Sequence, residues 1–241
     1  MAQVHPWREL LGAGCALLLV TAIPAAAATL QMDWNGCGTG IHDVHVQPGG
    51  AYALYASVTG QTEPHRGYRL TVQLQSAQGD LPDAWRFDPA GCQGTAHFTA
   101  EFSAPNVFFR CPDFANAPIS SGTTFFDFNG SSASFGVLHD YAPDQTDVNP
   151  GQRYFIAHFV FDQSNAAIGV DEVPATCDNL QAAMCLHVTE AAYIGIDGIE
   201  HPWSVVPDYL TAEGVGIAPG NCLATPAKAS TWGLIKAQYR L

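Results

Sequence analysis

The densest group of metal-ligating side chains in the sequence is His42-Asp43-Val44-His45. In a strand the two histidines would point to opposite faces, whereas in a helix they would be neighbours. The Pro48-Gly49-Gly50 run that follows indicates a loop, in which either geometry is open. A solvated loop is the default interpretation, and a metal site is the alternative.

A second polar group, Asp144, Asp147 and Asn149, offers the oxygen ligands that calcium prefers. Its spacing fits no EF-hand loop, because no glycine stands mid-loop and no glutamate closes it. A turn capped by Asp and Asn side chains explains the same residues equally well. Calcium at this site is the only cofactor that the sequence suggests.

Three tryptophans, Trp34, Trp85 and Trp203, are candidates for a sugar-stacking platform. Core packing is the stronger explanation for at least two of them. Trp203 lies between prolines in EHPWSVVPDY and is expected to be exposed, so it is the candidate ligand-binding residue.

Serine, histidine and acidic residues are numerous, but no GxSxG nucleophile elbow and no HExxH motif occurs. His158 lies in a nearly continuous apolar run and is expected to be a hydrogen-bonded core histidine. The sequence names no catalytic residue and therefore favours a non-enzymatic protein.

Residues 1–28 have the three parts of a secretory signal peptide. A short polar start contains Arg8, an apolar run begins at Leu10, and a row of alanines follows Pro24. Cleavage is expected after Ala27 or Ala28, and no later segment is long and apolar enough to span a membrane. The predicted location is extracellular, on the cell surface or periplasmic.

The charge of the chain is strongly acidic and unevenly distributed. The formal net charge is −13, and residues 29–225 hold 21 acidic residues against five arginines, a net of −16. Phosphate contacts require Lys and Arg, so nucleic acid is excluded as a partner.

Six cysteines remain after the signal peptide, an even number that indicates disulfides in an exported protein. They can pair in many ways, and the sequence does not choose among them. Proximity along the chain favours Cys92 with Cys111 and Cys177 with Cys185, which leaves Cys37 with Cys222 to tie the two ends together.

The segments around these residues have the patterns of β-strands. Tyr68–Gln75 and Ala96–Phe102 alternate between apolar and polar residues, and Tyr154–Phe161 is apolar almost throughout, as in a strand covered on both faces. Single helical turns are expected in Leu81–Phe87 and Asn179–Met184. Further strands are expected at Leu30–Trp34, Ala51–Val58, Val107–Cys111, Thr123–Phe128, Ser132–Leu138 and Cys185–Ile196.

This pattern predicts an all-β fold, a single disulfide-stapled β-sandwich of the jelly-roll or immunoglobulin-like kind over residues 29–224. Residues 225–241 are expected to be a linker and a short helical C-terminal tail. As a helix, the tail would place Trp232, Ile235 and Tyr239 on one face with Lys236 and Arg240 beside them.

The closing STWGLIKAQYR, residues 230–240, resembles the C-terminal motif of a group of exported bacterial β-sandwich proteins. LPDAWRFD at Leu81–Asp88, GCQG at Gly91–Gly94 and NPGQRYFIAHFVF at Asn149–Phe161 also fit that group. The resemblance implies a secreted domain without an assigned activity and supplies no catalytic residue. The group often has a second cysteine before the Ala51 strand, which is absent here, and this departure supports pairing Cys37 with Cys222.

The prediction is a secreted or cell-surface, non-enzymatic protein with a role in adhesion, binding or extracellular structure. A carbohydrate-binding module is the alternative, and an extracellular hydrolase ranks third. The expected partners are export or surface-attachment machinery that reads the tail, and a glycan or another surface protein.

Overall fold

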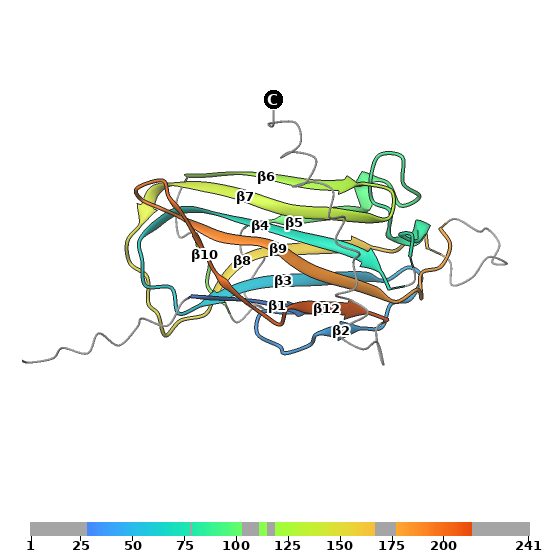
Figure 1. Ribbon diagram of the computed structural model, residues 1–241, viewed down its shortest axis with the longest axis horizontal. Helices are drawn as coiled ribbons and strands as arrows, with labels where there is room; N and C mark the ends of the chain where they lie inside the picture. The colour runs from blue at the N-terminus through green and yellow to red at the C-terminus, as the bar shows by residue number, and fades with distance from the viewer. Residues whose placement is uncertain (1–27, 78, 103–110, 115–118, 167–176, 214–241) are drawn as a thin grey trace, which may run out of the picture.

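The computed structural model describes residues 28–77, 79–102, 111–114, 119–166 and 177–213. Within these ranges the chain forms two β-sheets packed face to face (Figure 1). The predicted all-β sandwich is therefore confirmed. None of the helices in these ranges is long and apolar enough to cross a membrane.

The first sheet has five strands in the order β11-β1-β3-β8-β5. Its members are antiparallel except for the parallel pair of β1 and β11. Their bounds are Thr29–Trp34 for β1, Ala51–Thr59 for β3, Phe98–Glu101 for β5, Tyr154–Asp162 for β8 and Ser204–Val206 for β11.

The second sheet has the order β2-β12-β9-β4-β7-β6, with β10 pairing on β9 as its seventh strand. The long antiparallel set of β9, β4, β7 and β6 forms most of its area. The bounds are Asp43–Val44 for β2, His65–Ser76 for β4, Ile119–Phe128 for β6, Ser132–Gln145 for β7, Met184–Gly195 for β9, Glu200–Pro202 for β10 and Tyr209–Ala212 for β12.

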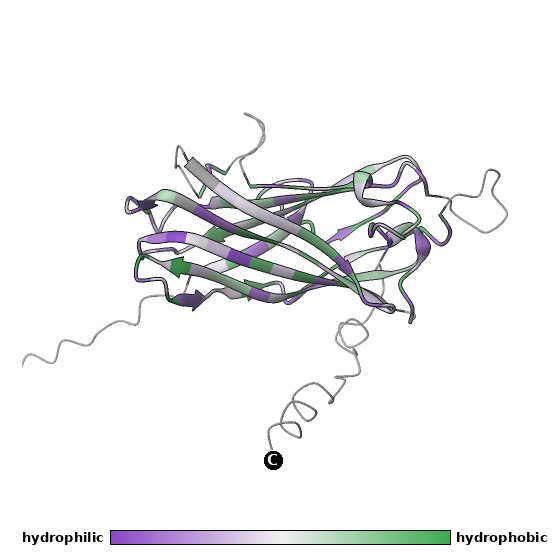
Figure 2. Cartoon of the chain, turned by 90° about the horizontal axis from the view of Figure 1, so that it is seen from above, coloured by the Kyte–Doolittle hydropathy of each residue, from purple (hydrophilic) through white to green (hydrophobic). Residues whose placement is uncertain are grey.

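Period-two alternation decides which side chains enter the core (Figure 2). In β4, Tyr68, Leu70, Val72 and Leu74 are fully or almost fully buried between the sheets, as the sequence predicts. In β8 a register shift against β3 at Ala56 and Ser57 interrupts the alternation, so Phe155 lies on the outer face and Phe159 on the inner face. Both rings are buried, so both faces of β8 are covered.

Most predicted strands are present, several of them longer than expected. The helical turn predicted in Leu81–Phe87 is the 3₁₀-helix η1 (Asp83–Trp85), whereas residues 179–182 form only a hydrogen-bonded turn. A second 3₁₀-helix, η2 (Thr95–His97), replaces the start of the predicted Ala96–Phe102 strand. The predicted strand Val107–Cys111 lies outside the described residues except for Cys111.

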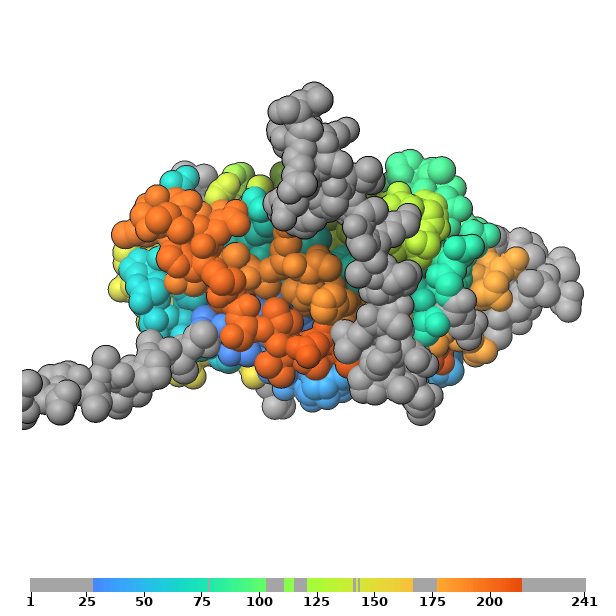
Figure 3. Space-filling view, in the orientation of Figure 1, coloured from blue at the N-terminus to red at the C-terminus, as the bar shows by residue number. Residues whose placement is uncertain are grey.

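The first two described strands pair with the last two. β1 pairs in parallel with β11, and β2 pairs in parallel with β12. In the space-filling view the blue N-terminal strands accordingly touch the orange-red segment that holds β10 to β12 (Figure 3).

The disulfides differ from the predicted pairs. Cys37 is bonded to Cys111, and Cys92 to Cys177. Segment 111–114 pairs with β8 through Phe114 N donating to Phe155 O, which brings Cys111 against the Cys37 loop. The disulfide partners are therefore determined by the fold and not by proximity along the chain.

The remaining predicted pairs fail for the same reason. The bond between Cys92 and Cys177 excludes the predicted Cys177–Cys185 pair. The bond between Cys37 and Cys111 likewise excludes the predicted Cys37–Cys222 pair. Cys185 is also disulfide-bonded, and Cys222 lies outside the described residues.

Candidate functional site

The candidate site is built on residues 35–42, here called the Gly loop, which connect β1 to β2. Alternation along β1 sends Trp34 into the core, where its Nε1 donates to Thr211 O at 2.9 Å. The preceding residue, Asp33, therefore points to the outer face of the five-stranded sheet, toward the loop.

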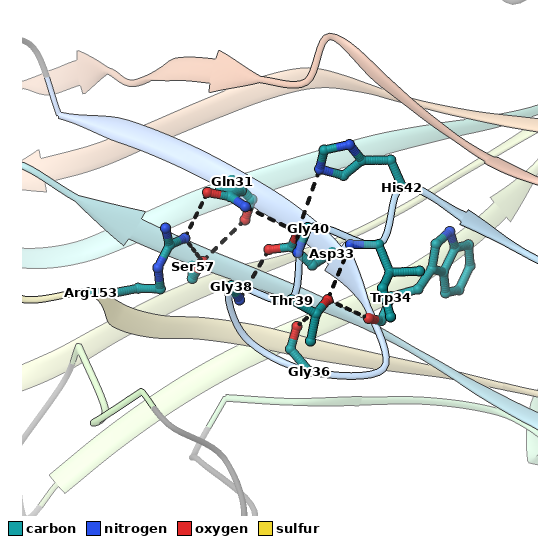
Figure 4. Close-up of polar contacts among 11 residues, drawn as sticks. Gln31, Asp33, Trp34, Gly36, Gly38, Thr39, Gly40, His42, Ser57 and Arg153 are labelled. Carbon is teal, nitrogen blue, oxygen red and sulfur yellow. Dashed lines mark hydrogen bonds and ion pairs between the residues drawn. The ribbon is translucent and has the colours of Figure 1, made fainter.

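The Asp33 carboxylate organises the Gly loop from within (Figure 4). Its Oδ2 accepts from Gly38 N at 3.1 Å, and its Oδ1 accepts from Gly40 N at 2.9 Å and Gln31 Nε2 at 3.0 Å. The side chain is fully buried, so these donors replace the water that a carboxylate requires.

The backbone of the loop is bent to aim those amides at one point. Gly38 and Gly40 have φ of 72° and 71°, a left-handed conformation that glycine adopts without steric cost. Thr39 Oγ1 donates to Trp34 O at 2.8 Å, and Trp34 N donates to Ile41 O at 2.8 Å, which closes the base of the loop.

Two further ties hold the loop on the sheet. The disulfide joins Cys37 to Cys111, and both cysteines pack with Tyr55 and Phe155 in a small apolar cluster on the outer face. Beside it, Arg153 Nη1 donates to Gln31 Oε1 at 2.8 Å and to Ser57 Oγ at 3.0 Å. The loop is therefore fixed on a rigid sheet by hydrogen bonds and a covalent bond.

What the fixed loop offers to solvent is its tip. Residues 38–42 are all exposed, and they include Ile41, one of five large apolar side chains that are exposed in the described part of the chain. The His42 ring is 45% exposed, with its Nε2 3.5 Å from Asp33 Oδ1. An exposed isoleucine and an imidazole on a preorganised loop suit contact with another molecule.

Buried ionisable groups continue across the same outer face. His158 stacks on Tyr55 at 4.6 Å between ring centroids, and its Nδ1 lies 3.4 Å from Glu101 Oε2. Burial, and then the Glu101 charge, raises the pKa of Tyr55 to about 12. Burial lowers the pKa of His158, against the opposing effect of Glu101. His158 is buried and hydrogen-bonded, as the sequence predicts.

The structure separates the two histidines of the predicted metal-ligating cluster. His42 faces Asp33, whereas His45 Nδ1 lies 2.6 Å from Glu213 Oε1 on the far side of β2. Among the residues that the structure describes, no three His, Cys, Asp or Glu side chains are grouped so as to hold a metal ion.

The predicted calcium ligands lie at the end of β7 and in the turn beyond it. Asp144, Asp147 and Asn149 are all exposed. Asn149 Oδ1 accepts from Gly151 N at 2.9 Å, so this side chain caps a turn, the alternative that the sequence left open.

The prediction that Trp203 is exposed is wrong. It is buried at 5% exposure, because β10 and β11 on either side of it carry the ring into the core, where its Nε1 donates to Gln61 Oε1 at 3.1 Å. Trp34 and Trp85 are also buried. No tryptophan among the described residues is available to stack on a sugar.

One cluster resembles a hydrolase triad that sequence reasoning could not find, because its parts come from η2 and the end of β8. Asp162 Oδ2 and Ser164 Oγ lie 3.2 and 3.0 Å from His97. Both contact Nδ1, while Asn165 Nδ2 lies 3.1 Å from Nε2. A triad needs the carboxylate and the hydroxyl on opposite ring nitrogens, so this geometry does not activate the serine.

Asp162 is ionised more readily than an ordinary aspartate. Burial by itself would raise its pKa, but the hydrogen bonds from His97 and Ser164 outweigh that effect and lower it. The carboxylate therefore acts as a fixed acceptor at the end of β8.

A polar hollow of about 620 Å³ lies beside η1 and contains Asp80 and Asp83. Both residues are exposed, and Asp83 forms an ion pair of 3.6 Å with Arg86. The acid of a glycosidase is a carboxyl group in a buried, apolar environment, whereas the carboxyl groups of this hollow are exposed to solvent.

The predicted tail residues Trp232, Ile235, Lys236, Tyr239 and Arg240 lie outside the described residues, as do residues 1–27 of the predicted signal peptide.

The sequence matches no protein-family model, and no curated protein matches it. Among solved structures, a type II cohesin domain from the cellulosome of Acetivibrio cellulolyticus has 8% identity and a TM-score of 0.43, covering 78% of this chain and 95% of that one. The second type II cohesin module of the ScaA scaffoldin from the same organism has 10% identity and a TM-score of 0.41, covering 77% and 96%.

A non-cellulosomal cohesin from the archaeon Archaeoglobus fulgidus has 10% identity and a TM-score of 0.35, covering 78% of this chain and 90% of that one. Similarity at this level does not bear on what the chain binds.

Proposed function

We propose that the chain is a secreted, non-enzymatic binding module that contacts a protein partner through the tip of the Gly loop, residues 38–42. The observation that carries the proposal is the fully buried Asp33 carboxylate, which holds the loop in one conformation while Ile41 and His42 stay exposed.

Rigidity matters because a loop that is ordered before binding loses little conformational entropy when it binds. The Cys37–Cys111 disulfide and the Thr39 hydrogen bonds add to this preorganisation. An exposed isoleucine is the kind of side chain that becomes the apolar centre of a contact, with polar groups such as His42 at its rim.

The alternatives have less support. A carbohydrate-binding module is disfavoured because the three tryptophans of the described domain are buried. A hydrolase is disfavoured because the His97 cluster places acid and hydroxyl on the same ring nitrogen. An adhesive or structural role in an extracellular layer is compatible with a protein-binding loop.

The test is capture of a partner from the extracellular fraction of the source organism by the immobilised protein. Ile41→Asp should lose the captured protein, because a carboxylate replaces the apolar contact. Ile199→Asp is the matched control, since Ile199 is also exposed but lies in the turn between β9 and β10. Equal capture by both variants, or no specific capture by the unmodified protein, would refute the proposal.

We also propose that the chain is addressed at both ends, by cleavage after Ala27 or Ala28 and by the basic segment of residues 230–241. Deleting Ser230 to Leu241 should mislocalise the protein in cell fractionation while its thermal unfolding stays unchanged. Normal delivery of the truncated protein would exclude the tail as a sorting signal.

A further inference from the structure

We propose that the protein forms a homodimer by antiparallel pairing of β6 with β6 of a second copy. The inference starts from the edge strands that the described part of the chain forms. Most are short: β2 has two residues, β10 and β11 have three each and β5 has four. The exception, β6, has ten residues.

Strand β6 lacks the features that keep edges from pairing. Proteins protect an edge with lysines, prolines, bulges or a very short strand. The β6 sequence ISSGTTFFDF contains no proline and no basic residue, and Asp127 is its single charge. Its register with β7 runs without a bulge from Ile119 to Phe128. The edge of β6 that faces away from β7 pairs with none of the described strands. In Figure 2, β6 is the strand nearest the viewer.

The hairpin that joins β6 to β7 fixes which backbone groups are free. Asn129 N donates to Ser132 O at 3.0 Å, so this pair is a hydrogen-bonded one. Hydrogen-bonded pairs recur every second residue in an antiparallel ladder. The odd-numbered residues of β6 therefore bond to β7, and the N–H and C=O groups of Gly122, Thr124, Phe126 and Phe128 point to the open edge.

A second copy of the same strand satisfies these groups when Thr124 lies opposite Thr124 of the other copy. Every residue i then faces residue 248 − i, and the free groups meet as hydrogen-bonded pairs. A two-fold axis normal to the sheet produces this arrangement and keeps each face of the sheet continuous across the dimer.

Side chains in this register are compatible. Gly122 lies opposite Phe126; Phe102 of the same chain covers Gly122, and the Phe126 ring packs inward on Phe87 and Phe98, so neither residue obstructs the pairing. Thr123 lies opposite Phe125, a β-branched and aromatic pair of the kind that stabilises sheets. Asp127 lies opposite Ser121, so the single charge of each strand does not meet its own copy. These pairings favour a second copy over an arbitrary extended peptide.

Electrostatic repulsion opposes the dimer. Residues 29–225 carry a net charge of −16, and two such bodies repel each other at low ionic strength. Salt screens that repulsion, because the Debye length falls from about 10 Å at 0.1 M to about 3 Å at 1 M. Dimerisation should therefore strengthen with salt, the reverse of an association held by ion pairs.

The first experiment is sedimentation of the mature protein over a concentration series at low and high NaCl. A dimer that strengthens with salt is expected. Thr124→Pro removes an edge-facing N–H and should weaken the dimer by about tenfold or more, whereas Thr124→Val keeps the N–H and should leave it intact. Thr124→Lys, which sets two ammonium groups opposite each other, provides a second disruptive variant if the proline variant does not fold.

The second experiment tests the register by mild oxidation of the folded protein. Thr124→Cys should give a covalent dimer, because its Cα lies about 5.5 Å from that of its copy in a hydrogen-bonded pair. Ser121→Cys is the matched control, since its copy lies six residues further along, about 20 Å away. A protein that remains monomeric at all concentrations and salt levels, or a dimer that Thr124→Pro and Thr124→Lys leave unchanged, would overturn the proposal.

Discussion

The interior of the sandwich has two aromatic ends with different chemistry. Around η1 and the hairpin of β6 and β7 the rings are phenylalanines and two tryptophans, and Phe161 is at their centre. Its ring centroid lies 5.3 to 6.1 Å from those of its neighbours. These neighbours are Trp34, Trp85, Phe87, Phe98 and Phe135.

At the other end, where β4 and β8 begin, the rings carry polar atoms. His65 stacks on Phe114 with 3.8 Å between centroids, and Tyr68 lies 5.1 Å from His139. Tyr68 Oη donates to Ile156 O and lies 2.9 Å from His139 Nδ1. Tyr154, Tyr193 and Trp203 complete this end.

Two equally buried parts of this core therefore respond differently to the pH of the solution. The phenylalanine end contributes by area and packing, which do not titrate. The histidine end contains His65, which is fully buried. Burial lowers the pKa of His65 to about 4, and a hydrogen bond to Glu63 O opposes this effect only in part. Acid should therefore weaken one end of the core and leave the other intact.

The largest expected effect is truncation at the phenylalanine end. Phe161→Ala removes a ring that five others contact and leaves a cavity, so the free energy of unfolding should fall by about 3 to 5 kcal/mol. Urea unfolding at pH 7 and pH 5 measures it, and the loss should be the same at both values. A loss of stability that depends strongly on pH would contradict the difference between the two ends of the core.

Acidification tests the histidine end. The unfolded His65 has a pKa of about 6.5 and the folded one about 4, so the unfolded state binds more protons between these values. The free energy of unfolding should thus fall as pH drops from about 6.5 to 4, by about 3 kcal/mol in total.

Burial also lowers the pKa of His139, against the opposing charge of Asp140, and adds to the same trend. His65→Gln should flatten the slope whatever its effect at pH 7. An unchanged slope in that variant would mean that His65 does not carry the response.

The smallest effect is expected from Tyr68→Phe, which keeps the ring but removes the hydroxyl shared by Ile156 O and His139. Losing a buried donor of this kind should lower the free energy of unfolding by about 1 to 2 kcal/mol. Thermal or urea unfolding of the variant measures it, and Phe135→Leu at the other end gives a comparison without a polar group. A neutral Tyr68→Phe would show that the polar end tolerates loss of its hydrogen bonds.

Strands were predictable because their signal is local. The alternation of Tyr68, Leu70, Val72 and Leu74 is present in the sequence itself, and the structure buries the same four residues. Strands β2, β10 and β11 have only two or three residues and are too short to show a period. Their positions could therefore not be predicted from the sequence.

The site depended on distant parts of the chain and was largely missed. The sequence shows Asp33 only as a polar residue in a strand. Its side chain is buried because the Gly loop folds back over it, which the sequence does not indicate. Cys37 finds Cys111 through the pairing of segment 111–114 with β8, a contact without a sequence signature. The prolines around Trp203 predict exposure, whereas the strands on either side of it and the hydrogen bond to Gln61 keep the ring buried.

The parallel pairing of the first two described strands with the last two has a mechanical consequence. A load that pulls the two ends of the domain apart acts along β1 and β11 in opposite directions, and likewise along β2 and β12. Such a force shears the rows of hydrogen bonds, so they must yield together instead of opening one after another as in a peeled hairpin. Joined at both ends to other structures, the sandwich would behave as a stiff link in a chain under tension.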